Sequence, residues 1–355
     1  MSIVYVLGAG ASHASVGTPL GPDLVWNYHE DCFQLSELFG DAAIETGPSF
    51  DNYRKFLVLM EKEFPELSGI VEKWDNKGIN IYNLPTLQKR HYVDELLQLL
   101  QFKQDSQSMT LVRQLTFQHI VGSGMVGTND LYERFKADVL AKIPNGEVSI
   151  VSFNFDSYLN EAPPGVTFDY LLDFHWREPN RLHYCSSPVA IPLIKLNGSF
   201  DWGICSQAGH LNLLHYFLRG DFYRHAKCNI TSCQGVLEPL VILPYTDPSS
   251  KLSKLWAVAE EHLAKAERVI IIGYSFPPYD NKVTELFQRC LRSGTKLEIV
   301  DKKLLEDKDE AGAKTRLRIK YRALLPGVKI YEDHISVRGF EDFLLNGKRR
   351  KGKLD

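Results

Sequence analysis

The 355-residue chain has no long apolar run, no strong net charge and no regular cysteine frame. No hydrophobic stretch reaches the roughly 20 residues that a helix needs to cross a bilayer, so we expect no transmembrane segment. The chain starts directly with a strand-like segment and shows no basic and apolar leader, which favours a cytoplasmic location. The six cysteines are scattered, as is typical of reduced thiols rather than of a disulfide-bonded secreted domain.

Several classes of protein lack support in this sequence. A formal net charge of −3 provides no global field that would recruit nucleic acid or an anionic membrane. There is no Gly-x₄-Gly-Lys-Ser/Thr loop of a P-loop ATPase and no Gly-x-Ser-x-Gly elbow of a serine hydrolase. No nucleic-acid-binding module is evident either. We therefore expect neither a membrane nor a nucleic-acid partner.

Short apolar segments rich in β-branched residues alternate with amphipathic helical patterns along much of the chain. The strand-like segments are residues 2–7, 147–153, 191–196, 241–243, 269–272 and 297–300. Helical patterns cover residues 252–266 and 282–291. This alternation predicts an α/β fold with a doubly wound, mostly parallel, Rossmann-like sheet.

Residues 30–145 have a different, helical texture. Apolar residues recur at helical spacing in residues 93–100 and 131–143, and residues 49–74 look helical up to a break at Pro65. We therefore expect a nucleotide-binding core formed by residues 1–29 and 146–355, with a helical insertion at 30–145. A small cap, also expected to be helical, is predicted for about residues 203–235.

A glycine-rich turn directly follows the first strand. Gly8-Ala9-Gly10-Ala11-Ser12 separates that strand from a segment that can be helical. A strand, a glycine turn and a helix place backbone N–H groups and a helix N-terminus against a phosphate. The third glycine of the usual fingerprint is missing, because position 13 is histidine. The turn nevertheless predicts a nucleotide ligand.

Polar or glycine-containing segments also follow the other predicted strands. In parallel α/β sheets the ligand binds beyond the carboxyl ends of the strands. Several such junctions in one chain predict a single shared ligand crevice. The junctions lie at residues 8–12, 153–156, 196–202 and 273–277 and at Asp301.

Four of these motifs occur in the order seen in sirtuin-like domains. They are Gly8-Ala9-Gly10-Ala11-Ser12, Ser152-Phe153-Asn154-Phe155-Asp156, Lys195-Leu196-Asn197-Gly198-Ser199 and Gly273-Tyr274-Ser275-Phe276-Pro277. The sequence resembles the bacterial sirtuin-like proteins linked to phage defence more than the protein deacetylases. The resemblance spans about residues 1–25 and 145–302.

The resemblance implies NAD as the ligand. In that case Gly8, Ala9, Gly10, Ala11 and Ser12 would hold the pyrophosphate. Asn154 would contact the ribose next to nicotinamide and help to place a water molecule. Gly273 and Ser275 would line the phosphate and adenosine side, and Asp301 would bind the adenosine ribose hydroxyls. From the residues alone, Asn154 and Asp301 also fit ordinary turns, and Ser275 fits a helix cap.

One departure from the family pattern decides the expected chemistry. The position of the family's catalytic histidine is Asn197 here, and asparagine cannot accept a proton near neutral pH. Deacetylation needs that base, whereas cleavage of the nicotinamide–ribose bond needs less activation of water. We therefore expect an NAD⁺ glycohydrolase with Asn154, Asn197 and Asp156 in its catalytic site. Asp156, His13 and His175 are the candidates to replace the missing base.

Two alternatives stay open at this point. Loss of the base is also compatible with a sensor that binds NAD or ADP-ribose without turnover. The helical insertion is compatible with an interaction subunit, either as a homo-oligomer or with a partner defence protein.

No metal is predicted from the spacing of the candidate ligands. Deacetylases of this family hold zinc with two Cys-x₂-Cys pairs. Here Cys205, Cys228 and Cys233 are interspersed irregularly with three histidines, and Cys-x₄-Cys is a poor match to tight zinc motifs. These histidines are His210, His215 and His225.

Overall fold

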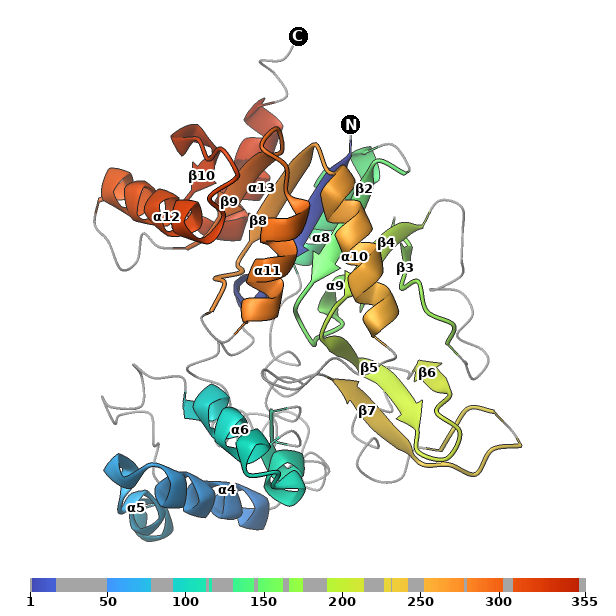
Figure 1. The fold of residues 1–355 in the computed structure, drawn as a ribbon, viewed down its shortest axis with the longest axis vertical. Coiled ribbons are helices and arrows are strands. Elements are labelled where there is room, and N and C mark those ends of the chain that lie inside the picture. The colour runs from blue at the N-terminus through green and yellow to red at the C-terminus, as the bar shows by residue number, and fades with distance from the viewer. Residues whose placement is uncertain are drawn as a thin grey trace. The chain divides into compact units, whose positions relative to one another are not determined.

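The computed structural model separates the chain into two compact units (Figure 1). Unit 1 comprises Met1–Val16, Thr128–Ile242 and Pro248–Asp355, and unit 2 comprises Gly17–Gly127 and Leu243–Asp247. The structure describes residues 2–16, 50–77, 92–112, 115–116, 130–143, 146–161, 166–174, 190–213, 227–230, 232–241, 252–277, 280–302 and 309–350.

Unit 1 is built on a seven-stranded parallel sheet with the strand order β10-β9-β8-β1-β2-β4-β3. The strands are β1 (Ile3–Leu7), β2 (Val148–Ser152), β3 (Phe168–Asp169), β4 (Ile191–Lys195), β8 (Arg268–Ile272), β9 (Lys296–Val300) and β10 (Ile335–Ser336). The predicted doubly wound α/β sheet is confirmed. Every residue of β1 and β2 is buried, as a strand covered on both faces requires.

Helices cover both faces of this sheet. One group contains α10 (Ser253–Lys265) and α11 (Asn281–Cys290), which contact each other, together with α12 (Glu310–Leu324) beside α11. The other contains α1 (Ala9–Val16), α8 (Asp130–Arg134) and α13 (Gly339–Arg350), which also contact one another. Figure 1 shows α10 and α11 on the near face and α8 and α13 on the far face.

The order in which strands are added to the sheet reverses between β1 and β8. From β1 the chain continues to β2 and β4 on one side, whereas from β8 it continues to β9 and β10 on the other side. The neighbours β1 and β8 are paired in register from Ile3↔Arg268 to Leu7↔Ile272. The carboxyl ends of these two strands therefore form a topological switch point, where open α/β sheets bind ligands.

A second, antiparallel sheet has three strands in the order β6-β5-β7. They are β5 (Gly198–Cys205), β6 (Leu211–Leu213) and β7 (Leu237–Val241). The helical cap predicted for residues 203–235 is wrong for the described part of that segment, which contains the end of β5, the strand β6 and non-helical turns. The parallel strand predicted at 241–243 is also wrong, since Val241 ends the antiparallel strand β7 and residues 242–243 lie outside the described residues.

Unit 2 contains the helices predicted for the insertion. They are α4 (Phe50–Glu63), α5 (Ile70–Lys77) and α6 (Tyr92–Phe102), with a short 3₁₀ turn, η2 (Pro65–Leu67), at the predicted break. Phe56 and Met60 on α4 and Leu96 on α6 are fully buried. Their helical spacing is the reason that the pattern was readable in the sequence.

The boundaries of the insertion differ from the predicted 30 and 145. The segment from residue 128 onward belongs to unit 1, and so do α8 and the π-helical turn η5 (Phe135–Val139). Tyr132 and Phe135 are buried in the core of unit 1, and the Phe135 ring makes an edge contact with Tyr5 on β1 at 5.0 Å between centroids. Burial against the sheet therefore assigns this segment to the core. None of the described helices is both long enough and apolar enough to cross a membrane.

Candidate functional site

The turns that follow β1 and β8 are interlocked at the switch point. The amide of Gly10 donates to the carbonyl oxygen of Gly273 at 2.9 Å, and the amide of Gly8 donates to Ile272 at 3.0 Å. A Cβ on Gly8 would lie 2.5 Å from the Gly273 oxygen, and Gly273 itself has a φ of +64°. Only glycine permits this approach of two backbones.

Gly8 and the first four residues of α1, which together make the predicted glycine turn, have different environments. Ala9 is exposed and Gly10 is half-buried, whereas Gly8, Ala11 and Ser12 are buried. The amide of Ala11 donates to Gly8 at 2.9 Å, so protein carbonyls already satisfy the amides of both Gly10 and Ala11. The exposed edge around Ala9 is thus the part of the turn that a ligand can reach, and the buried residues shape it.

A buried polar network connects this turn to the end of β2. The side-chain amide of Asn154 donates to the Gly8 carbonyl and to Ser12 Oγ, both at 2.9 Å. Ser12 Oγ donates to Asp156 Oδ2 at 2.7 Å. Because the only hydroxyl proton of Ser12 is then used, the Tyr132 hydroxyl at 2.7 Å is the donor to Ser12. Burial raises the pKa of Tyr132, which keeps it protonated as that donor.

A buried lysine lies behind this network. Lys195, at the end of β4, donates from Nζ to the backbone carbonyl of Asp156. Burial lowers the pKa of Lys195, while the negative charges of Asp156 and Asp201 oppose the shift. Burial raises the pKa of Asp201, and Lys195 opposes that shift. Among the described residues, Asp201 Oδ1 has no hydrogen-bond partner, and Tyr170 contacts Oδ2 at 3.4 Å.

Asn197 lies beside the same edge of the sheet. Its Nδ2 donates to the carbonyl of Phe153 at 3.1 Å, which leaves Oδ1 as its acceptor for a ligand or for water. The Phe153 ring stacks on Tyr274 with centroids 4.3 Å apart. The junctions after β2, β4 and β8 therefore contact one another, as the shared crevice requires.

The adenosine-side candidates lie at the turns after β8 and β9. Ser275 is exposed, and its carbonyl accepts from Lys320 Nζ at 2.5 Å. Asp301 is half-buried directly after β9 and accepts from the Lys302 amide at 2.8 Å. Because β8 and β9 run parallel to β1 in the same sheet, both turns share its carboxyl edge.

The structure shows where the other residues proposed from the sequence lie, and it adds two residues to the site. His13 is exposed on α1, and His175 lies outside the described residues. Asp156 is only 8% exposed and is engaged by Ser12. Sequence reasoning missed the roles of Tyr132 and Lys195. Lys195 stands inside one of the four motifs, two residues before Asn197, whereas Tyr132 lies in a segment that was predicted to be helical from the spacing of its neighbours.

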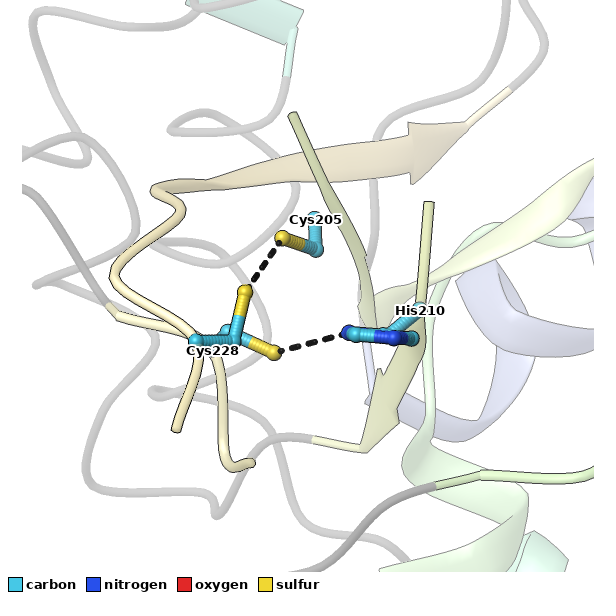
Figure 2. A group of neighbouring side chains, drawn as sticks. Cys205, His210 and Cys228 are labelled. Carbon is cyan, nitrogen blue, oxygen red and sulfur yellow. Dashed lines mark hydrogen bonds between the residues drawn. The ribbon is translucent and has the colours of Figure 1, made fainter. Parts of the chain in front are cut away.

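Three cysteines and a histidine meet at one end of the antiparallel sheet, where Figure 2 labels Cys205, His210 and Cys228. The fourth member is Cys233, whose Sγ lies 3.4 Å from Cys205 Sγ. Cys228 Sγ lies 3.6 Å from His210 Nδ1. The prediction of no metal rested on irregular spacing, yet the fold brings together a donor set that suits a soft divalent cation.

The backbone supports negative charge on one of these sulfurs. The amide of Ala208 hydrogen-bonds to the Cys205 sulfur, and the amide of Gln207 does so with a smaller effect. These hydrogen bonds lower the pKa of the Cys205 thiol to about 7. Thiolate is the form of cysteine that binds metals.

Comparison with known proteins finds likenesses among solved structures alone. No protein-family model and no curated protein matches the sequence. A structure of Sir2Tm bound to a propionylated peptide is similar with 12% identity and a TM-score of 0.42, covering 99% of this chain and 93% of that one. A mutant Sir2 homologue in complex with ADP-ribose shows 14% identity and a TM-score of 0.42, covering 100% and 94%. A further sirtuin structure, determined to explain substrate affinity, shows 12% identity and a TM-score of 0.43, covering 98% and 93%.

Proposed function

We propose that this chain binds NAD at the carboxyl edge of β1 and β8 and hydrolyses its nicotinamide–ribose bond. The observation that carries the proposal is the interlocked pair of glycine turns at the switch point, where the Gly10 amide donates a hydrogen bond to the Gly273 carbonyl. Open α/β sheets bind nucleotides at such a point. The resemblance of the surrounding motifs to those of sirtuin-like domains supports NAD as the nucleotide.

The binding roles follow from exposure and position. The edge around Ala9 and Gly10 would contact the diphosphate, because the other residues of the turn are buried. Ser275 and Asp301 would lie on the adenosine side, since their turns follow the strands on the far side of β1 from Asn154. A carboxylate such as Asp301 can accept hydrogen bonds from both hydroxyls of a ribose.

The proposed reaction converts NAD⁺ and water into ADP-ribose, nicotinamide and a proton. Nicotinamide leaves as a neutral molecule from a cationic ring, so no side chain has to protonate it. The carbonyl oxygens of Asn154 and Asn197 would orient the ribose and the attacking water. Neither asparagine can accept a proton near neutral pH, which argues for hydrolysis and against deacetylation.

Asp156 fits a positioning role better than that of a base. Its carboxylate is buried and accepts from Ser12, which in turn accepts from Asn154. It would act on the reaction through these two residues by fixing the Asn154 amide. A carboxylate engaged in this way is not aimed at a substrate water.

Incubation of the purified chain with NAD⁺, followed by chromatography, tests the proposal. We expect nicotinamide and ADP-ribose in equal amounts. Asn154→Ala should lower the turnover number by about 10²-fold or more. Asn281→Ala, at an exposed asparagine on α11, is the matched control and should leave turnover unchanged. Absence of product, or equal turnover in Asn154→Ala, would contradict hydrolysis at this site.

The second candidate is a sensor that binds NAD or ADP-ribose without turnover. Asn197 favours it, because its side-chain amide is bound to Phe153 and supplies no base. Calorimetry with NAD⁺, combined with recovery of the ligand, separates the two functions. Binding with intact NAD⁺ recovered would support the sensor, and recovery of nicotinamide would support the hydrolase.

A role in antiviral (phage) defence, with a homo-oligomer or a partner defence protein, is the cellular setting that we propose for this activity. Plaque counts on bacteria that express the chain test it. Protection should be lost in Asn154→Ala if hydrolysis of NAD is the effector step. Equal protection by that variant would separate the defence role from the chemistry.

A further inference from the structure

We infer that Lys195 is a positioning residue, which holds the backbone of the loop that carries Asn154 in the geometry required for the proposed hydrolysis. This role rests on the proposed function, because Asn154 is placed there against the nicotinamide ribose. Lys195 is only 3% exposed at the end of β4, so it does not reach a substrate itself. It would act through Asp156 and Ser12.

The loop on both sides of Asn154 is fixed by residues 195–200. Backbone carbonyls of the loop accept hydrogen bonds from this one segment. The pairs are the Leu196 amide to Ser152 at 3.0 Å, Asn197 Nδ2 to Phe153 at 3.1 Å, and the Phe200 amide and Ser199 Oγ to Phe155 at 2.8 and 3.1 Å. Lys195 Nζ adds the last link by donating to the carbonyl of Asp156.

Asp156 transmits the position of this link to Asn154. The backbone carbonyl of Asp156 is held by Lys195, and its carboxylate accepts from Ser12 Oγ at 2.7 Å. Ser12 Oγ in turn accepts from Asn154 Nδ2 at 2.9 Å. A shift of the Asp156 backbone would therefore move both hydrogen-bond partners that precede the Asn154 amide.

These contacts decide which atom of Asn154 a ligand meets. Asn154 Nδ2 also donates to the Gly8 carbonyl at 2.9 Å. A carbonyl can only accept, so the amide must turn its nitrogen toward Gly8 and Ser12. The side-chain oxygen is then the atom that stays available to orient the ribose and the attacking water.

The charge of Lys195 distinguishes it from the other donors. It is the only charged residue among residues 195–200, and a charged donor makes a stronger hydrogen bond than a neutral one. Burial lowers the pKa of Lys195, and the negative charges of Asp156 and Asp201 oppose that shift. Asp201 is buried on β5. Lys195 thus has two roles, as the donor to Asp156 and as the charge partner of Asp201, and mutation can separate them.

A double variant removes the hydrogen bond and keeps the charges balanced. Lys195→Met removes the donor to Asp156, and Asp201→Asn removes the negative charge that the methionine would leave uncompensated. We expect the turnover number for nicotinamide release, corrected for the folded fraction, to fall by about 10-fold or more, because small misplacements of reacting groups are costly. The change in KM should be smaller. Asp201→Asn alone keeps the donor and should lose less turnover than the double variant.

Leu263→Ala is the control for lost stability alone. Leu263 is fully buried near the end of α10, next to Lys265, whose carbonyl accepts from Ser2 at the opposite edge of the sheet. Its turnover per folded molecule should equal that of the wild type. Wild-type turnover in the double variant, or an equal loss in Asp201→Asn alone, would overturn the positioning role, since Lys195 would then only balance charge.

A second pair of substitutions covers the case in which the double variant does not fold. Lys195→Met with Asp201→Leu makes the pair apolar, and apolar replacements of buried ion pairs are often as stable as the original. The same loss of turnover is expected. Turnover equal to that of the wild type would again overturn the role of Lys195.

Hydrogen exchange separates failure of this inference from failure of the proposed function. If the wild type releases no nicotinamide, hydrolysis is refuted, and the exchange rate of backbone amides in residues 153–157 decides instead. Faster exchange there in the double variant than in Leu263→Ala would support Lys195 as the anchor of the loop. Equal exchange in the two variants would overturn it.

Discussion

The backbone amide of Gly10 donates a 2.9 Å hydrogen bond to the carbonyl of Gly273, and this contact joins the two turns at the switch point. The turns follow β1 and β8, which are neighbours in the sheet but are far apart in the sequence. The shape of the proposed diphosphate site therefore depends on a contact between two glycines.

Gly273→Ala should destabilise the fold and weaken NAD binding together. The new Cβ would lie 2.4 Å from the Ala11 amide nitrogen, and the residue has a φ of +64°. A left-handed conformation costs a non-glycine residue about 1–2 kcal/mol. Overpacking adds about 1–3 kcal/mol. Denaturant unfolding and calorimetry with NAD⁺ measure the two effects.

Gly294→Ala is the matched control. A Cβ at this exposed position would have nothing within 4 Å, and no positive φ opposes it. Its free energy of unfolding and its NAD affinity should equal those of the wild type. If Gly273→Ala behaved like Gly294→Ala, the interlocked turns would not shape the site.

Ser12→Ala should disturb catalysis more than Tyr132→Phe. Removing the Ser12 hydroxyl deprives both the Asp156 carboxylate and the Asn154 amide of a buried partner, and each loss costs about 1–3 kcal/mol. Tyr132→Phe removes only the hydroxyl group that donates to Ser12. Steady-state kinetics should show a lower turnover number with a smaller change in KM for Ser12→Ala. A larger loss in Tyr132→Phe would reverse the proposed order.

Local patterns predicted much of the fold, because most strands and helices carry their own signal. The apolar runs after residue 2 and residue 268 mark β1 and β8, and helical spacing marks α6 and α11. The short strands β3 and β10 have two residues each and too few side chains for any periodicity. They exist because neighbouring strands offer them backbone partners.

The candidate sites differed in how far the sequence could define them. The glycine turn was readable because its residues are consecutive. The network of Ser12, Tyr132 and Asn154 was not readable, because it joins three distant segments through side chains. The Cys205 and Cys233 pair was missed for the same reason, since antiparallel pairing of β5 with β7, rather than linear spacing, brings the sulfurs together.

Lys195→Met should be strongly destabilising, and Asp201→Asn should partly correct it. Lys195 is buried and counters the charge of Asp201. Removing one member of a buried charge pair costs about 3–5 kcal/mol, because the other charge is left uncompensated. Denaturant unfolding of the two single variants and the double variant forms a cycle. The double variant should be more stable than Lys195→Met alone, whereas purely additive losses would show that the two charges do not interact.

Asn197→His should convert the chain into a faster hydrolase and give it a new pH dependence. Asn197 is half-buried beside Phe153, at the edge where the nicotinamide ribose is proposed to lie. A positioned general base contributes about 10²–10⁴-fold to the rate. A histidine with a pKa near 6.5 accepts a proton only when neutral, so the added rate should appear as pH rises through that value. Nicotinamide release measured from pH 5 to pH 9 would show it. Asn197→Gln, which keeps an amide, should lack that step in the profile. A flat profile in Asn197→His would mean that position 197 does not face the attacking water.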